Sequence, residues 1–271
     1  MKVYKYYAPI DYNFDAIAKK YLFFCRANKL NDPFEANFKF KHYGIVPPTM
    51  KNEFERIEID IQKTIGVCSF SKTPTNKALW ALYADNYAGF VVEYDISSLG
   101  CMAISMEGEI PRVLDDGSKE VSDCPQGLLT QGDVGYCKFP KEKIEEYDII
   151  AIDERDYRKI QLKDCNDQRN KDILISICLL QKDERYWQAE EEYRLIAGFH
   201  IEGQEVFNFY DSGYKIPLGK DIKVVSVTVG YNIEEQDIVK LQESFSKDPD
   251  VKFYRVFPNL KKCVLEQEEV K

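Results

Sequence analysis

Short runs of apolar and aromatic residues recur along the whole chain, and this feature constrains the fold more than any other. β-Branched and aromatic residues favour extended backbone, so each run is typical of a short β-strand. We predict strands at residues 3–7, 21–26, 66–71, 88–95, 134–139, 192–199, 204–210, 222–230 and 251–257. The run at residues 88–95 is almost continuously apolar, which predicts a central place in a sheet.

Helices are fewer, and they do not alternate regularly with the strands. We expect them at residues 13–20, 50–63, 76–84, 168–184 and 234–246, with Asn13 as the cap of the first. Because regular alternation would indicate a parallel α/β sheet, this order instead predicts a single α+β domain over residues 1–271. Residues 97–133 are rich in Gly, Asp, Ser and Pro, which predicts a loop-rich excursion from that domain.

Composition excludes several classes of protein. A net charge of −9 argues against broad, non-specific binding of nucleic acid, although it does not exclude a local basic groove. The longest apolar run, residues 173–180, is far too short to cross a membrane, and the N-terminus lacks the pattern of a signal peptide. We therefore expect a cytoplasmic protein with no membrane partner.

Metal binding is not expected either. The eight cysteines include no CxxC pair, and His42 and His200 are the only histidines. Zinc sites need clustered Cys and His ligands, and this spacing supplies none. Without a signal peptide, the cysteines are expected to be reduced thiols.

Three consecutive glutamates, Glu190, Glu191 and Glu192, directly precede the predicted strand at residues 192–199. Like charges repel one another, and burying a carboxylate at the edge of a core costs free energy unless the charge is paired or has a chemical role. Either the triplet is a solvated helix end that leads into a strand, or one of the acids does chemistry. The phosphate-binding, nucleophile-elbow and zinc-protease motifs are all absent, so they offer no other site.

Five further motifs carry a resemblance. They are "YKY" at residues 4–6, "NDPFE" at 31–35, "SFS" at 69–71, "LWxxYAxxxxGF" at 79–90 and "WxxExEYR" at 187–194. Together they resemble a widespread bacterial domain family of unknown function that is often met near phage-defence genes, over residues 3–230. That family in turn is similar to the ADP-ribosyltransferase superfamily, which includes toxins that modify DNA. The resemblance implies a single α+β domain of twisted, mostly antiparallel sheets with flanking helices, with NAD as substrate and no metal.

The resemblance also implies roles for the two outer glutamates. Glu192 would accept a hydrogen bond from a ribose 2′-hydroxyl of NAD and stabilise the positive charge that builds as nicotinamide leaves. Glu190, on the same side of an extended chain, would orient or deprotonate the acceptor. The reaction passes through an oxocarbenium-like state, for which a nearby carboxylate is the natural stabiliser.

The remaining site residues are implied as contacts to NAD. Ser69 and Ser71 would hydrogen-bond the nicotinamide ribose, and Tyr83 would stack on the nicotinamide ring. Arg194 would bind a phosphate or pair with a glutamate. The first motif contributes Lys5 and Tyr6, and Lys5 stands where the superfamily usually has His or Arg. Lysine donates hydrogen bonds but lacks the planar fork of arginine and the geometry of imidazole.

Three functions follow as hypotheses. The first is an NAD-dependent ADP-ribosyltransferase that modifies a macromolecule, protein or nucleic acid, as a toxin in phage defence. The second is a non-catalytic module that binds a nucleotide or protein on a degenerate transferase fold, which Lys5 favours. The third is a metal-dependent nuclease built on Asp183, Glu184, Glu190 and Glu192. It is the weakest, because such nucleases gather acids from separate strands beside a lysine and the sequence shows no such pattern.

Overall fold

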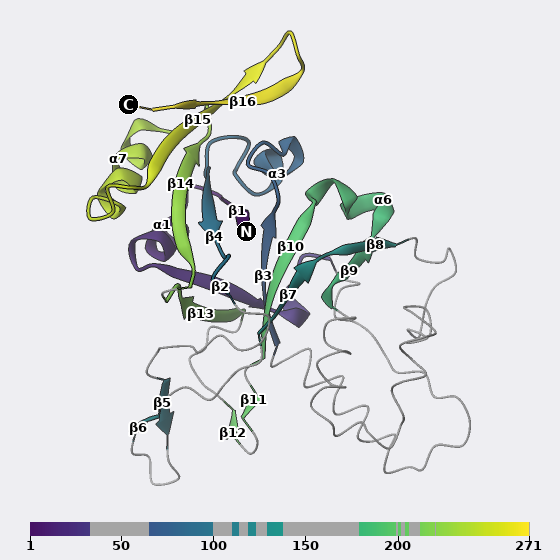
Figure 1. Cartoon of the computed structure of the whole chain (residues 1–271), viewed down its shortest axis with the longest axis vertical. Helices are drawn as coiled ribbons and strands as arrows, with labels where there is room; N and C mark the ends of the chain where they lie inside the picture. The colour runs from purple at the N-terminus through teal and green to yellow at the C-terminus, as the bar shows by residue number, and fades with distance from the viewer. Residues whose placement is uncertain are drawn as a thin grey trace.

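A ten-stranded sheet forms the centre of the structure (Figure 1). In this computed structural model of the chain, the described residues are 1–32, 65–99, 110–113, 119–122, 129–137, 179–198, 200–201, 204–205, 212–219 and 221–270. Few helices accompany the sheet, and together they form one domain of mixed α and β structure. The predicted single domain of mixed α and β structure is confirmed.

The sheet is built from strands far apart in the sequence. Its main path runs β13 (Gly213–Pro217), β2 (Tyr21–Arg26), β3 (Ile65–Ser71), β1 (Lys2–Tyr7), β4 (Phe90–Asp95), β14 (Lys223–Val229), β15 (Lys252–Asn259) and β16 (Val264–Glu269). β10 (Glu192–Gly198) pairs with β3, and β7 (Leu129–Asp133) pairs with β10. Within the described ladders of this sheet, pairing is antiparallel except between β14 and β15.

The helices and small sheets lie around this centre. The helices are α1 (Asp11–Ala18), α3 (Lys77–Leu82), α6 (Glu184–Trp187) and α7 (Glu235–Ser244), with short 3-10 turns η1 (Ala27–Lys29) and η4 (Gln188–Glu190). Three two-stranded sheets pair β5 (Ile110–Val113) with β6 (Lys119–Ser122), β8 (Gly135–Cys137) with β9 (Gln181–Asp183), and β11 (His200–Ile201) with β12 (Gln204–Glu205). None of the described helices has the length and apolar character needed to cross a bilayer.

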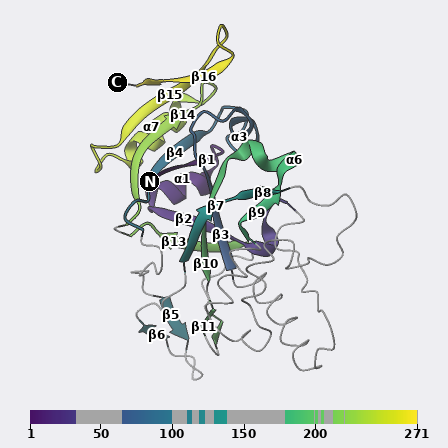
Figure 2. The same cartoon turned by 45° about the vertical axis from the view of Figure 1, so that its right-hand side comes forward.

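The sheet divides between β1 and β3. β1 pairs along its whole length with β4, and β3 pairs along its whole length with β10, as Figures 1 and 2 show for the second pair. Between β1 and β3 the recorded pairing is a single position, Tyr4 opposite Ser71. At its other end β3 pairs with β2 through Gly66 and Val67. The middle of β3 therefore faces a gap where β1 and β2 diverge.

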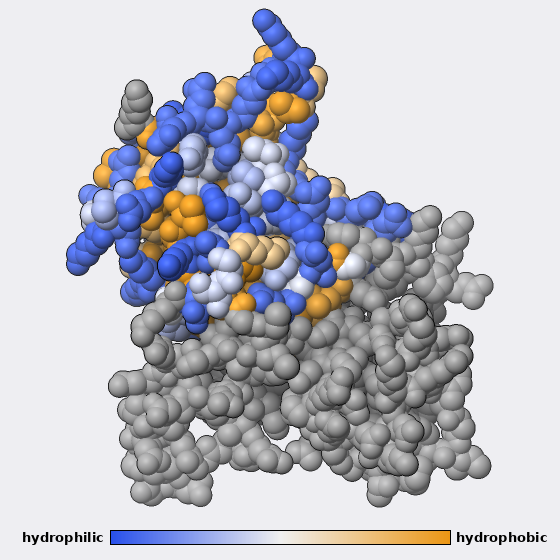
Figure 3. All heavy atoms as spheres, in the orientation of Figure 1, coloured by the Kyte–Doolittle hydropathy of each residue, from blue (hydrophilic) through white to orange (hydrophobic). Residues whose placement is uncertain are grey.

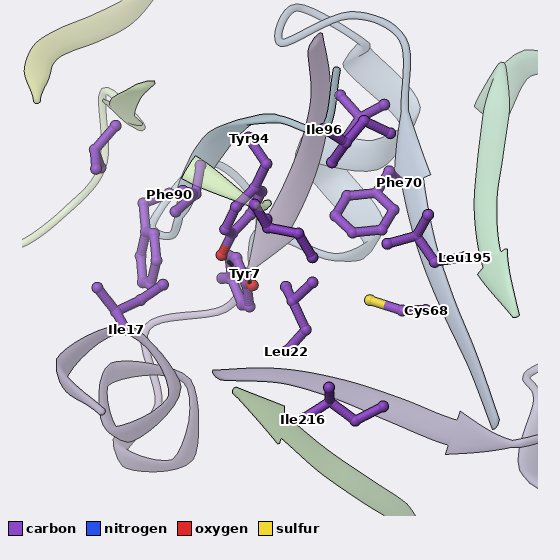
Figure 4. Close-up of a cluster of buried hydrophobic side chains, with 14 of the residues drawn as sticks. Tyr7, Ile17, Leu22, Cys68, Phe70, Phe90, Tyr94, Ile96, Leu195 and Ile216 are labelled. Atoms are coloured by element: carbon purple, nitrogen blue, oxygen red, sulfur yellow. Dashed lines mark hydrogen bonds between the residues drawn. The ribbon is translucent and has the colours of Figure 1, made fainter. Parts of the chain in front are cut away.

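One large hydrophobic cluster fills the face of the sheet that α1 and α7 cover. Figure 4 shows part of it, from Ile17 of α1 to Leu195 of β10. Strands on both sides of the division contribute to it, including β4 with Phe90 and Tyr94, and β3 and β10 with Cys68 and Leu195. Within it the hydroxyls of Tyr7 and Tyr94 lie 2.9 Å apart in a buried hydrogen bond. The two parts of the sheet thus share one core.

A smaller cluster covers the opposite face, because side chains alternate between faces along a strand. It centres on Trp80 of α3 and includes Val91 of β4 and Val256 of β15. The rings of Trp80, Tyr87 and Tyr231 stack in sequence, with centroid separations of 5.8 Å and 4.8 Å. The hairpin of β15 and β16 projects beyond this cluster and carries a mostly hydrophilic surface (Figure 3).

Two predicted helices differ from the structure. α1 begins at Asp11, so Asn13 is not its cap. Asn13 is the third residue of the helix, and its side-chain amide donates to the carbonyl of Ala8 at 2.9 Å. The predicted helix at residues 168–184 is wrong at its end, where Gln181–Asp183 form β9. Pairing with β8 overrides the local helical pattern there. Residues 168–178, like the predicted helix at 50–63, lie outside the described residues.

The predicted excursion at residues 97–133 is also shorter than expected. Its last five residues form β7, which pairs with β10 in the main sheet, and β5 and β6 form a hairpin within it.

β13 and β16 have no counterpart among the predicted strands. β16 reads "VLEQEE", and Glu and Gln are poor strand formers, so its sequence pattern is weak. Most of the predicted strand at 204–210 lies outside the described residues.

Candidate functional site

A cavity of about 150 Å³ opens beside the division between β1 and β3. Sequence-predicted site residues from separate segments line it, namely Lys5, Tyr6, Ser69, Ser71, Tyr83, Glu190 and Glu192. They come from β1, β3, the end of α3, η4 and the start of β10. α3 and α6 lie at the same end of β3 and β10, which brings these segments together (Figure 1). The last predicted residue, Arg194, is not part of the lining.

Arg194 is 1% exposed and pairs with Glu192. Its Nε and Nη2 donate to the two carboxylate oxygens of Glu192 at 2.6 Å and 3.1 Å, and its Nη1 donates to the carbonyl of Leu179 at 2.7 Å. Such a bidentate, charge-assisted pair is among the strongest hydrogen-bonded contacts in proteins. Of the two roles expected for Arg194, the structure shows pairing with a glutamate.

Glu192 is 4% exposed, yet its surroundings favour the charged form. Burial alone raises the pKa of the Glu192 carboxyl. The Arg194 guanidinium and the Lys182 ammonium outweigh it and, with a hydrogen bond from Ser69, lower the pKa to about 2 from the usual 4.5. The Glu192 carboxylate is therefore ionised throughout the physiological pH range.

Lys182 joins the two site glutamates, and sequence reasoning missed it. Its Nζ lies 2.7 Å from Oε2 of Glu190 and 2.9 Å from Oε2 of Glu192. The side chain is 2% exposed and its ammonium lies 4.5 Å from the centroid of the Trp187 ring. Its position in β9 beside β8 was expected to be helical. A lysine in the charged stretch "KDERYW" gives no sign of burial in a single sequence.

Tyr83 contacts Glu190 through its hydroxyl group. Its Oη donates to Oε1 of Glu190 at 2.9 Å and accepts from Nδ2 of Asn31 at 2.5 Å. Burial, followed by the neighbouring Glu190 carboxylate, raises the pKa of Tyr83 above its usual value, so the hydroxyl keeps its proton. The ring also lines the cavity, where it was expected to stack on nicotinamide.

The backbone turns between the two glutamates. Glu190 ends η4, Glu191 adopts a left-handed conformation with φ 46° and ψ 51°, and Glu192 begins β10. The expectation of an extended chain from Glu190 to Glu192 is therefore wrong. The two carboxylates converge on Lys182 because of the turn at Glu191, whose own side chain is exposed.

The other predicted residues also have protein partners. Ser71 Oγ donates to the carbonyl of Glu190 at 3.1 Å, which holds η4 against β3. Lys5 Nζ donates to the carbonyl of Ser69 at 3.1 Å, across the gap between β1 and β3. Tyr6 Oη donates to the carbonyl of Thr73 at 2.8 Å and accepts from the amide of Asn76 at 3.0 Å. Lys5, Tyr6 and Ser69 also line a second cavity of about 220 Å³.

A metal centre has no support in the described part of the chain, where no group of three His, Cys, Asp or Glu side chains could hold an ion. The nuclease hypothesis gains one feature, because Lys182 does lie beside two acids. Both contacts are direct ion pairs between the Lys182 ammonium and a glutamate carboxylate.

Of the "NDPFE" motif, Glu35 lies outside the described residues.

Comparison of the chain with known proteins finds no matching family model, curated protein or solved structure.

Proposed function

We propose that this chain is an NAD-dependent ADP-ribosyltransferase that modifies a macromolecular acceptor, protein or nucleic acid. The observation that carries the proposal is the convergence on one cavity of predicted site residues from four separate motifs. Nothing in local sequence requires Lys5, Ser69, Tyr83 and Glu190 to meet. Their meeting supports the resemblance from which the roles of these residues were expected.

The chemistry of the lining suits cleavage of the bond between nicotinamide and ribose. When that bond breaks, both electrons leave with nicotinamide and positive charge develops on the ribose, as in glycoside hydrolysis. A pair of buried carboxylates supplies the opposing charge in a water-poor site, where it acts more strongly than in solvent. The acceptor nucleophile then bonds to the ribose C1′ and loses its proton. The residues present need no metal for this step.

The size of the cavity restricts which part of NAD it holds. Pockets for whole drug-sized ligands enclose about 300–1,000 Å³, so a cavity of about 150 Å³ fits about one ring of the dinucleotide. The second cavity shares Lys5, Tyr6 and Ser69 with the first, and it offers room for more of the dinucleotide. Lys5 lies on the wall common to both, where its ammonium would meet the pyrophosphate.

The alternative is a non-catalytic module that binds a nucleotide or a protein. Lys5 favours it, because its ammonium already donates to the carbonyl of Ser69 across the gap in the sheet. In that case the cavity would bind a ligand without turnover.

Release of nicotinamide from NAD tests the two functions. Purified wild type and the double variant Glu190→Gln/Glu192→Gln, each shown by circular dichroism to be folded at the assay temperature, would be incubated with NAD, a chelator and a cell lysate as the acceptor source. The transferase predicts chelator-resistant release by the wild type alone, with ADP-ribose on a lysate macromolecule. Binding of NAD without release by either protein would support the module. The absence of both binding and release would contradict the transferase and a module that binds NAD.

The proposal extends to a toxin of the bacterial cytoplasm that acts in phage defence. Induced expression in a bacterial host should then arrest growth, and the double variant should not. Arrest by both proteins at equal expression would contradict a toxic activity of this site.

A further inference from the structure

We infer that Glu190 is the carboxylate that contacts the substrate, and that Glu192, which also lines the cavity, is a positioning residue that fixes Lys182 and Arg194. This assignment rests on the proposed function for its reaction, and it reverses the roles expected from the motif. It is argued from the hydrogen-bonding capacity of the two carboxylates.

Glu192 has its acceptor capacity filled by protein donors. An ionised carboxylate offers about four lone-pair positions. Arg194 occupies two through Nε and Nη2, Lys182 takes a third at 2.9 Å, and the hydroxyl of Ser69 supplies a fourth hydrogen bond. A ribose hydroxyl could reach Glu192 only by displacing one of these donors.

Displacement would be costly. Removing one partner from a buried ion pair leaves the other charge without compensation, and such a loss is strongly destabilising. A neutral sugar hydroxyl replaces a charged donor with a weaker one. The arrangement around Glu192 is therefore that of a structural anchor, which holds the Lys182 ammonium within reach of Glu190.

Glu190 has capacity to spare. In the described part of the chain it accepts two hydrogen bonds, from Tyr83 at Oε1 and from Lys182 at Oε2. About two of its lone-pair positions remain for a ligand. The carboxylate lines the cavity, and its side chain is held from both sides by donors that fix its direction.

The reaction follows from this placement. The ribose 2′-hydroxyl donates to Glu190, whose negative charge opposes the positive charge at the ribose as the C1′–nitrogen bond breaks. Both electrons of that bond leave with nicotinamide. The acceptor nucleophile forms the new bond to C1′, and its proton passes to solvent or to Glu190. Glu192 and Lys182 contact no reacting atom and act by holding Glu190 in place.

Single variants separate the two roles, with Glu191→Gln as the matched control from the same turn. Glu190→Gln should lower the melting temperature less than Glu192→Gln does and keep the KM for NAD near wild type, while kcat falls about 100-fold or more. Glu192→Gln should lower the melting temperature and raise KM, with kcat less affected than in Glu190→Gln. Glu191→Gln should match the wild type in all three.

The opposite split would overturn the assignment. It is wrong if Glu192→Gln keeps its melting temperature and loses kcat while Glu190→Gln stays active. It is also wrong if Glu190→Gln lowers the melting temperature as much as Glu192→Gln, a comparison that needs no NAD. A wild type that neither binds nor cleaves NAD would instead overturn the proposed function and the catalytic half of the assignment. The melting temperatures would then still decide which glutamate is the anchor.

Discussion

Three adjacent glutamates occupy three different environments in this molecule. Glu190 lines a cavity between a tyrosine and a lysine, Glu191 is exposed in a left-handed turn, and Glu192 is buried against Arg194. The same side chain therefore serves as a candidate ligand contact, a turn residue and an anchor. The difference arises from backbone direction and from Lys182, neither of which local sequence specifies.

Glu192 should make stability depend on acid pH. Its folded-state pKa of about 2 lies below the usual 4.5, so its stabilisation is present above about pH 5 and is lost as pH falls toward 2. The shift corresponds to roughly 3 kcal/mol. Urea unfolding of the wild type between pH 7 and pH 3 should show this loss, and Glu192→Gln should show a flatter dependence. An equally steep curve in Glu192→Gln, with Glu191→Gln as control, would contradict it.

Lys182→Met should strongly destabilise the fold. It removes the ammonium that separates two buried carboxylates, and breaking a buried ion pair in this way costs about 3–5 kcal/mol. Adding Glu190→Gln to Lys182→Met should restore part of the loss, because one of the uncompensated charges is then gone. A double-mutant cycle by urea unfolding measures this coupling. Purely additive changes would show that the contact contributes little.

At the scale of elements, a single side chain both caps α3 and joins the start of that helix to η4. Asn76 caps α3 by accepting from the amides of Ala78 and Leu79 at 3.0 Å and 3.2 Å. Its Nδ2 also donates to the carbonyl of Ala189 in η4. The helix that carries Tyr83 at its end is thus joined to the turn that carries Glu190, which sets the distance between the two.

Asn76→Ala should therefore cost about 1 kcal/mol for the cap and about 1 kcal/mol for the lost contact to η4. Asn76→Asp keeps the capping oxygen but cannot donate to Ala189, so it should cost only the second amount. Thermal unfolding of both variants gives the comparison. Equal losses in the two would mean that the cap contributes nothing to this helix.

The elements that sequence predicted well are those with strong local patterns. The aromatic run of β2 was placed at its observed bounds, and β3 and β14 were each placed to within one residue. β9, by contrast, forms through pairing with β8, and β16 has an acidic sequence. Seven of the expected site residues meet at the cavity. Lys182 was missed because its burial depends on the pairing of β9 with β8 and on the turn at Glu191 that brings both carboxylates to it.

At the scale of the whole molecule, two sets of strands meet through one backbone pair, Tyr4 and Ser71, and yet share a hydrophobic core. The core includes Phe90 and Val92 from one set and Leu22 and Leu195 from the other. Because neither set can unfold without exposing this common surface, burial couples them. The backbone division therefore permits a cavity without making two independent domains.

Unfolding should accordingly be a single transition. Trp187→Phe leaves Trp80 as the one tryptophan, and Trp80 is packed against β4 and β15 in one set of strands. Its fluorescence and the far-ultraviolet circular dichroism of the whole backbone should have the same urea midpoint. Separated midpoints would mean that the two sets of strands unfold independently.

The stacked rings of Trp80, Tyr87 and Tyr231 have an optical consequence. Aromatic rings this close together couple electronically, so light absorbed by the tyrosines should emerge as tryptophan emission, and the stack should give a strong near-ultraviolet dichroism band. Trp80 belongs to α3, the helix that Asn76 fastens to η4. The fluorescence and near-ultraviolet dichroism of this stack should therefore report a change at the cavity without an added dye.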